Sequence, residues 1–410
     1  MKVIILAEHF DPLIGGATHL TKKIVAGIAQ QEHEVTLIVP NSGTTQLEKD
    51  NSTYPYQLVK IGIEVEIGDR KRFVRGRRKK FALDVDAYLK ALPEAERPDV
   101  LVVMTGLYLL RHVDLAYFRK QGIKVLANHL NIPPQEAGLS WEGDSFLRRF
   151  KDQFRLKLIG WINARRVAHH EADAYSVISE HTKNLLQSII GKREVKVIPL
   201  GCEFTGFLPQ EPGTGFQKPI RILTAGGINP SKNQHIIPEI AAKLVEEGID
   251  FVWHIIGPIR NQAYADYFLA EIDRYALGER IVFVPGMPKD ELMGYYEQTD
   301  IYIQTSLEEG FCMTALDAIL YGLPLIGSVA GAIPAFIEEG RGILVENKAP
   351  AYVEAIRKVI AQPSDYGLGP DKIPKIVEKY SWEANAQAYI DIFEQLSASH
   401  ASTSTLETAQ

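Results

Sequence analysis

The stretch that decides the fold runs from Ser306 to Pro334 and reads SLEEGFCMTALDAILYGLPLIGSVAGAIP. It begins at the end of the apolar run IYIQTS, which is typical of a buried strand, and Gly310 permits a tight turn. Residues 314–321 then have helical periodicity, so the loop ends at a helix N-terminus, where backbone N–H groups suit a diphosphate. Glu309 in the loop can reach sugar hydroxyls, and Asp317 can accept two hydrogen bonds from a ribose diol. Simple capping by two acids is the alternative interpretation.

The order of strands and helices places this stretch in the second of two similar domains. Strand-length apolar runs recur in the first half as VIILAE, EVTLIVP, VLVVMTG, KVLANHL, AYSVIS and VKVIPLG. After a turn-rich segment from Glu203 to Pro219, the rhythm restarts with RILTAGG, FVWHIIGP, IVFVPG, IYIQTS, PLIGS and GILV. Strands alternating with helices are typical of parallel sheets. We therefore predict an α/β protein of two facing Rossmann-like domains, residues 1–205 and 206–380, with ligand at the carboxyl ends of their strands.

The C-terminal end of the chain is helical before it loses its pattern. Trp382, Tyr389 and Phe393 fall on one face of residues 381–396, which predicts a helix packed along that face. The tail, residues 397–410, is rich in Ser, Thr and Ala and lacks apolar periodicity. We predict that this tail is disordered.

Composition excludes several classes of protein. A chain of 410 residues with 46% hydrophobic and 23% charged residues is an ordinary globular protein with room for two domains. No apolar run has the length of a membrane span, and the first one breaks at Glu8, which favours a cytoplasmic protein. Cys202 and Cys312 lack the spacing of a disulfide framework or a zinc site. The net charge of −6 argues against general nucleic-acid binding.

Positive charge is nevertheless concentrated in two segments. Arg70–Lys80 reads RKRFVRGRRKK, which predicts contact with an anionic membrane, a lipid-phosphate acceptor or an acidic glycan. A second segment from Leu147, LRRFKDQFRLKLIGWINARR, spaces apolar residues at helical intervals and could lie on anionic lipid. A solvated helix or loop is the alternative for each. We therefore expect peripheral contact with the inner face of the membrane through Arg70–Lys80.

Two further motifs bear on ligands. Gly15 and Gly16 follow the first strand and open onto the helical THLTKKIVAGIAQQ, and paired glycines let anionic oxygens approach the backbone. The dinucleotide pattern G-x-G-x-x-G is absent there. The D-x-D triplet Asp84-Val85-Asp86 lies within an amphipathic helical stretch and not at the end of a strand. We interpret its acids as solvated and predict no catalytic metal.

Taken together, these motifs resemble the retaining glycosyltransferases of family 4, glycosyl transferases group 1, which have the GT-B fold. Glu309 and Asp317 match the family's spacing of two acids, although the second is usually Glu, so the reach is shorter by about 1.5 Å. In AGGINPSKN, Lys232 matches a family lysine, whereas Gly227 replaces the usual Arg. The first forty residues match as well, through Pro12 to Gly16 and the later His-Glu-Val. Because the Arg is absent, we expect phosphate binding that is weaker or that is supported by other groups.

The resemblance implies transfer of a hexosyl unit from a nucleoside diphosphate sugar to the hydroxyl of a glycan, a lipid-linked acceptor or a small molecule. Retention at the anomeric carbon, no cofactor and a last helix that crosses back to the N-terminal domain are implied with it. The catalytic residues it assigns are Glu309, Lys232 and His129, of which His129 could equally be a core histidine. The donor-binding residues it assigns are Gly15, Gly16, Gly226, Gly227, Gly257, Met287, Gly310, Phe311, Cys312, Met313 and Asp317.

Two other functions stay open at this point. A nucleotide-sugar 2-epimerase shares the fold and would need acids and bases for proton abstraction. A catalytically weak sugar-nucleotide-binding subunit would account for Gly227 and for the shorter side chain of Asp317.

Overall fold

The computed structural model describes residues 1–8, 16–42, 48–50, 54–63, 73–104, 107–130, 172–209, 211, 213 and 215–407. They form two compact units, one of residues 1–130, 172–201 and 380–407 and the other of residues 202–379. The chain changes unit after Gly201 and again after Lys379, where the sequence predicts changes after residues 205 and 380.

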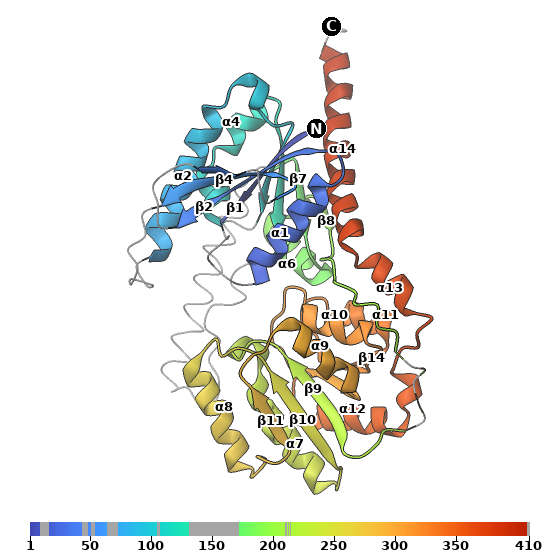
Figure 1. The fold of residues 1–410 in the computed structure, drawn as a ribbon. Helices are drawn as coiled ribbons and strands as arrows, with labels where there is room; N and C mark the ends of the chain where they lie inside the picture. The colour runs from blue at the N-terminus through green and yellow to red at the C-terminus, as the bar shows by residue number, and fades with distance from the viewer. Residues whose placement is uncertain are drawn as a thin grey trace. The chain divides into compact units, whose positions relative to one another are not determined.

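The N-terminal unit is built on an eight-stranded sheet of order β3-β4-β2-β1-β5-β6-β7-β8 (Figure 1). All strand pairs are parallel except β3 with β4. Because both faces of such a sheet are covered, its strands are nearly continuous runs of Val, Ile and Leu. The strands are β1 (Lys2–Ala7), β2 (Glu34–Ser42), β3 (Glu48–Asp50), β4 (Gln57–Ile63), β5 (Val100–Met104), β6 (Lys124–His129), β7 (Ala174–Val177) and β8 (Val195–Val197).

The helices of this unit connect the strands in the predicted alternation. Ser179 begins α6 as its N-cap, because the Ser179 hydroxyl accepts a hydrogen bond from the backbone N–H of Thr182. Phe81, Val85 and Leu89 of α2 are buried in the core against the sheet. The helices are α1 (Gly16–Ala29), α2 (Phe73–Lys90), α3 (Leu107–His112), α4 (Leu115–Lys120), α6 (Glu180–Ile190) and the 3₁₀ helix η1 (Glu94–Glu96).

The C-terminal unit has a six-stranded, fully parallel sheet of order β11-β10-β9-β12-β13-β14. Its strands are β9 (Ile220–Ala225), β10 (Phe251–Ile256), β11 (Ile281–Val284), β12 (Ile301–Gln304), β13 (Leu325–Ser328) and β14 (Gly342–Val345). From β9 the chain proceeds outward to β10 and β11 (Figure 1). It then returns to place β12, β13 and β14 on the other side of β9. The switch point between β9 and β12 is where ligands bind in sheets of this kind.

Helices complete this unit around a core of aromatic and aliphatic side chains. Trp253, Tyr264 and Phe268 are fully buried there. The helices are α7 (Ile237–Glu246), α8 (Gln262–Arg274), α9 (Lys289–Gln298), α10 (Met313–Leu320), α11 (Ile333–Gly340), α12 (Ala349–Ala361), α13 (Ile373–Lys379) and the 3₁₀ helices η2 (Pro230–Lys232), η3 (Gln234–Ile236) and η4 (Pro363–Asp365).

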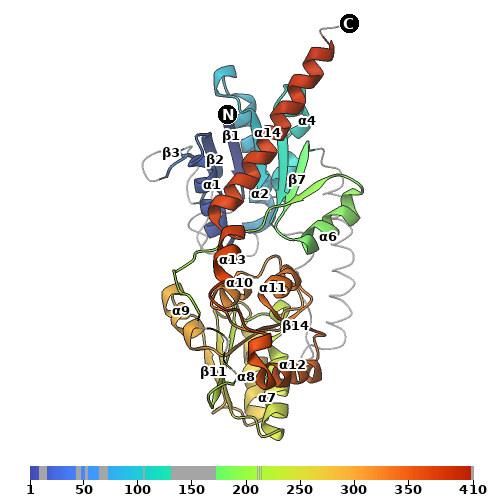
Figure 2. The same ribbon diagram turned by 90° about the vertical axis from the view of Figure 1, so that its right-hand side faces the viewer.

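The last helix, α14 (Trp382–Glu407), belongs to the N-terminal unit and packs beside α1, so the predicted return of the chain is confirmed (Figure 2). The Asn128 side chain at the end of β6 donates a hydrogen bond to the Tyr389 hydroxyl at 2.5 Å. The Asn385 amide donates to the Pro199 carbonyl at 2.6 Å. The Trp382 ring packs directly on the backbone of Gly201. A Cβ added to Gly201 would lie only 2.4 Å from an atom of that ring, so the glycine makes this contact possible.

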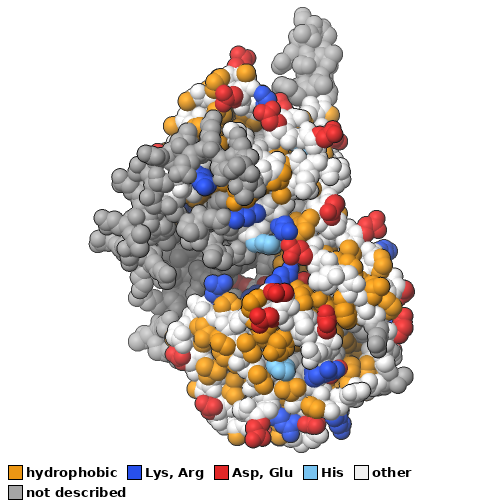
Figure 3. Space-filling view, in the orientation of Figure 1, with side chains coloured by type: hydrophobic (Ala, Val, Ile, Leu, Met, Phe, Trp, Pro, Cys, Tyr) orange, Lys and Arg blue, Asp and Glu red, His pale blue; other side chains and the backbone are white. Residues whose placement is uncertain are grey.

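The predicted disorder of the tail is wrong for residues 397–407, because α14 continues to Glu407. Propagating a helix that is already formed requires only one residue to be fixed per hydrogen bond, so a polar stretch can extend a packed helix. None of the helices in the described ranges is both long and apolar enough to cross a bilayer. Over the C-terminal unit, Figure 3 shows hydrophobic, acidic and basic side chains intermingled, without a large field of one sign.

Candidate functional site

The loops that leave β9 and β12 bring a lysine and a glutamate together in the C-terminal unit. After β9, the Asn229 side chain accepts a hydrogen bond from the backbone N–H of Ser231 and caps η2. This turn delivers Lys232, whose Nζ lies 2.5 Å from Oε1 of Glu309. The Lys232 and Glu309 side chains are 21% and 6% exposed, so the pair is largely withdrawn from water.

Glu309 is held by more than the lysine. Its Oε1 also accepts hydrogen bonds from the Ser306 hydroxyl at 2.7 Å and from Nε2 of Gln304 at 3.2 Å. The Tyr302 hydroxyl donates to Oε1 of Gln304 at 2.9 Å and so fixes the orientation of that amide. Oε2 of Glu309 has no hydrogen-bond partner in the part of the chain that the structure describes. One oxygen is thus fixed while the other can accept a ligand hydroxyl.

The turn between Glu309 and α10 is unusually tight. Cys312, the N-cap of α10, has φ 74°, a left-handed conformation that is uncommon outside glycine. Phe311 is buried edge-on against Phe336. Gly331 (φ 55°) packs on Glu309, since an added Cβ would lie 2.6 Å from the Glu309 Cβ. Burial raises the pKa of the Cys312 thiol, so this side chain is a neutral packing group.

Asp317 lies in α10, and its carboxylate is buried. Burial raises its pKa to about 6; the positive charge of Lys289 lowers the pKa by a smaller amount, and the negative charge of Glu203 raises it further. No hydrogen bond or ion pair to its carboxylate occurs within the described residues. Burying an ionised carboxylate without hydrogen-bond partners costs free energy, and hydrogen bonds from ligand hydroxyls would reduce that cost.

The remaining predicted donor residues lie in loops at the same edge of the C-terminal sheet. Gly226 and Gly227 follow β9, Gly257 follows β10, and Met287 follows β11. The backbones at Gly226 and Gly257 touch, because a Cβ at Gly257 would lie 1.9 Å from the Gly226 carbonyl oxygen. Gly310, Phe311, Cys312 and Met313 form the turn into α10. The predicted donor residues therefore come from segments far apart in sequence, and they all lie at the same edge of the C-terminal sheet.

The predicted residues of the N-terminal unit occupy the ends of two of its elements. His129 is the last residue of β6 and is buried. Gly16 is the first residue of α1. Gly15 lies outside the described residues.

The predicted charged segments are described only in part. Lys80 of α2 pairs with Asp84 at 2.6 Å, and Arg78 lies 3.9 Å from the buried Glu8. Asp86 pairs with Lys90 at 2.9 Å, so each acid of the D-x-D triplet forms an ion pair within α2, where the sequence predicts solvated acids. Residues 70–72 and the whole basic segment from Leu147 lie outside the described residues.

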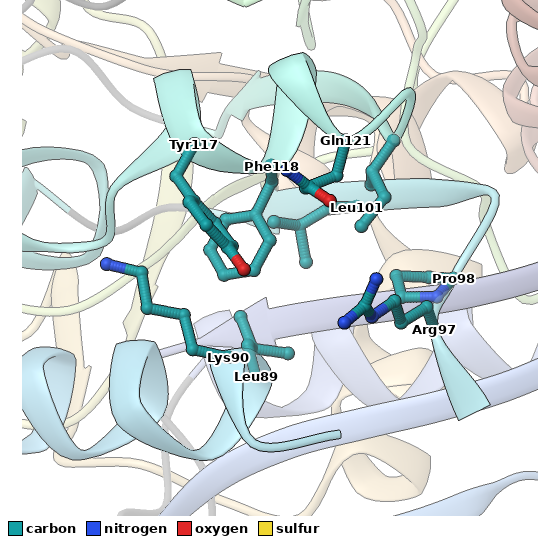
Figure 4. A pocket seen from close by; sticks show the side chains of 9 residues that line it. Leu89, Lys90, Arg97, Pro98, Leu101, Tyr117, Phe118 and Gln121 are labelled. Atoms are coloured by element: carbon teal, nitrogen blue, oxygen red, sulfur yellow. The ribbon is translucent and has the colours of Figure 1, made fainter. Parts of the chain in front are cut away.

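A small pocket of the N-terminal unit lies at the amino end of β5, away from the strand ends where ligands bind (Figure 4). Lys90 and Tyr117 line it, with Lys90 Nζ 5.0 Å from the centroid of the Tyr117 ring. Asp86 and Asp114 already neutralise that ammonium group. We assign the pocket to packing.

Sequence reasoning missed Gln304 and Ser306, which donate hydrogen bonds to Glu309, and Tyr302, which orients Gln304. The available signal was the polar ending QTS of an otherwise apolar strand. Among the residues that the structure describes, no group of three His, Cys, Asp or Glu side chains is arranged to hold a metal ion.

The chain is similar to several curated proteins over about half of its length. One is the D-inositol 3-phosphate glycosyltransferase of Corynebacterium urealyticum, 24% identical over 53% of this chain and 49% of that protein. Another is one polypeptide of the human phosphatidylinositol N-acetylglucosaminyltransferase, 26% identical over 52% of this chain and 43% of that polypeptide. The chain thus spans about half the length of the curated relatives it matches.

Solved structures share the fold over nearly the whole chain. Sucrose-phosphate synthase from Thermosynechococcus elongatus superimposes with a TM-score of 0.71 at 17% identity, covering 97% of this chain and 99% of that one. WaaG, a glycosyltransferase involved in lipopolysaccharide biosynthesis, has a TM-score of 0.64 at 16% identity, covering 95% and 99%. The predicted GT-B fold is confirmed.

Two sequence models of known families divide the chain between them. The model described as Glycosyltransferase Family 4 matches residues 14–205, and the model described as Glycosyl transferases group 1 matches residues 210–368. The first match covers strands β2 to β8 of the N-terminal sheet, and the second covers the residues Lys232, Glu309 and Asp317. The chain therefore belongs to the group 1, family 4 glycosyltransferases.

Proposed function

We propose that this protein transfers a hexosyl unit from a nucleoside diphosphate sugar to an acceptor hydroxyl, with retention at the anomeric carbon and without a metal ion or other cofactor. The observation that supports this most directly is the Lys232–Glu309 pair at the switch point, with Oε2 of Glu309 open to a ligand. The family membership supports the same proposal, and so does the buried carboxylate of Asp317, which no described residue bonds.

In the proposed reaction, the bond between the anomeric carbon and the diphosphate breaks while a bond to the acceptor oxygen forms on the same face of the sugar. Negative charge builds on the departing diphosphate, and Lys232 with the backbone N–H groups at the start of α10 would stabilise it. The departing phosphate takes the acceptor proton. Glu309 orients the transferred sugar, Asp317 holds the ribose, and His129 faces the donor sugar as the family resemblance implies.

The acceptor that we propose is phosphate-bearing or lipid-linked. Relatives named for inositol 3-phosphate and phosphatidylinositol support an anionic acceptor. The cations Arg77, Arg78, Lys79 and Lys80 on α2 support peripheral contact with an anionic membrane on the cytoplasmic side. If neutralising these four residues leaves binding to anionic liposomes unchanged, the membrane contact is wrong.

Two measurements test the proposed function. Thermal shift with UDP, GDP, ADP and their sugars should identify one nucleotide that stabilises the protein. With that donor, Lys232→Ala and Glu309→Gln should each lower the transfer rate by about a hundredfold or more, because each removes a preorganised contact. Transfer near the wild-type rate in both variants would refute the proposal, and an epimer formed without acceptor would instead favour a 2-epimerase.

A further inference from the structure

The two glycines that follow β9 each lie against the stem of a cationic side chain. A Cβ placed on Gly226 would lie 3.9 Å from Cε of Lys232. A Cβ placed on Gly227 would lie 2.9 Å from Cγ and 3.7 Å from Nε of Arg260. The space in which a residue at position 227 would start its side chain is therefore occupied by an arginine from the next loop.

The backbone that carries Arg260 is tied to the glycine loop. The Ile228 N–H donates to the Pro258 carbonyl, and the Arg260 and Asn261 N–H groups both donate to the Ile228 carbonyl, at 2.9, 3.1 and 3.2 Å. These bonds continue the parallel pairing of β9 and β10 beyond the sheet. Asn261 then caps α8 through the backbone N–H of Tyr264. The backbone position from which the Arg260 side chain starts is therefore fixed by the fold.

The guanidinium of Arg260 differs from those of other arginines in the same unit in its ion pairing. Arg221 pairs with Asp300, Arg274 with Glu271 and Arg280 with Asp250. Arg260 is exposed, and none of the side chains that the structure describes forms an ion pair or hydrogen bond with it. A guanidinium on a fixed backbone, without a partner among the described side chains and at the edge that holds Lys232, is suited to an anionic ligand.

We propose that Arg260 supplies the second cation for the diphosphate of the donor and so replaces the arginine that this chain lacks at position 227. This inference rests on the proposed function, since it concerns the same nucleotide. It specifies the expectation from the sequence that phosphate binding is differently supported in this chain, where Gly227 stands in place of an Arg. The stems of the two cations lie against the Gly226-Gly227 turn, and the absence of side chains on that turn leaves room for both.

The structure permits an exchange experiment. Gly227 does not have a positive φ, so a side chain there is strained only by contact with Arg260 and, more weakly, with the Pro258 carbonyl at 3.6 Å. Truncating Arg260 removes the first contact. We therefore expect Arg260→Ala to weaken binding of the nucleoside diphosphate about ten- to a hundredfold and the double variant Gly227→Arg with Arg260→Ala to recover most of that loss.

Calorimetric titration with the stabilising nucleoside diphosphate, and with the corresponding nucleoside, measures both effects. Only diphosphate binding should respond to Arg260→Ala, because the nucleoside has no anionic group. Arg274→Ala, at the far end of α8, is the matched control and should bind like wild type. Arg260→Gln keeps the stem and should lose affinity like Arg260→Ala, which separates the charge from packing.

The outcomes separate the inference from the proposed function. If wild type binds the diphosphate and Arg260→Ala binds it equally well, the role of Arg260 is refuted while the proposed function stands. Equal losses for the diphosphate and the nucleoside would also refute it, because the effect would then be one of loop folding. If wild type binds none of the three nucleoside diphosphates, both proposals fail.

Discussion

Asp317 should make the protein less stable at neutral pH than it would be with a neutral side chain. Its carboxyl is buried and its pKa rises from 3.8 to about 6 in the folded protein. Because the folded state then binds the proton more tightly than the unfolded chain does, stability falls as pH rises from below 3.8 to above 6. At about 1.4 kcal/mol per pKa unit, the loss is about 3 kcal/mol at pH 7.5.

Replacing this residue by Asn keeps the shape and removes the charge. We expect Asp317→Asn to raise the free energy of unfolding by up to about 3 kcal/mol at pH 7.5, with the gain shrinking towards zero near pH 4. The same change should weaken nucleotide binding, because a neutral amide accepts weaker hydrogen bonds from a diol than a carboxylate does. Such a gain in stability with a loss of function is typical of binding-site residues.

Urea denaturation at several pH values between 4 and 8 measures the first effect, and calorimetric titration with the nucleoside diphosphate measures the second. Asp300→Asn is the control, because it breaks the Asp300 pair with Arg221 in the same unit and should destabilise the protein. If Asp317→Asn is no more stable than wild type at pH 7.5, or if its gain is the same at pH 4, the assignment of an uncompensated buried charge is wrong.

Three further changes test how the site and the two units are built. Tyr302→Phe frees the Gln304 amide from its 2.9 Å hydrogen bond, so kcat should fall about tenfold with little change in the donor KM, and steady-state rates that match wild type would contradict this. Gly331→Ala should abolish most transfer activity because its Cβ would collide with Glu309, whereas Gly278→Ala, which has open space around it, should leave initial rates unchanged. Tyr389→Phe removes the hydroxyl that accepts from Asn128 and should cost about 1–3 kcal/mol in thermal unfolding, while nucleotide affinity in the other unit stays at the wild-type level.

Much of the architecture could be predicted because its signals are local. Runs of Val, Ile and Leu mark buried parallel strands whatever their partners are, and the turn-rich segment from Glu203 to Pro219 marks the change of domain. The face formed by Trp382, Tyr389 and Phe393 likewise predicts a packed helix. The prediction for the tail failed because composition describes an isolated segment, whereas residues 397–407 extend a helix that is already packed.

Positions in the site were harder to predict wherever a side chain depends on a neighbouring strand. Spacing along the chain indicates that Glu309 and Asp317 flank a helix start, but it does not reveal that Tyr302 and Gln304 hold the first of them. The alternating directions of side chains along β12 bring these residues to Glu309 only once the strand is formed.

By itself, the sequence determined the fold class, the family resemblance and the kinds of side chain that the Ser306–Pro334 stretch presents, because periodicity and spacing are properties of the chain alone. Tertiary structure decided which charges are compensated. It gave Glu309 three donors on one oxygen, gave Asp317 none from the residues that the structure describes, and placed Arg260 against Gly227. The reason is that burial and ion pairing depend on distances between loops from different strands, and only the parallel order of β9, β10 and β12 brings those loops to one edge.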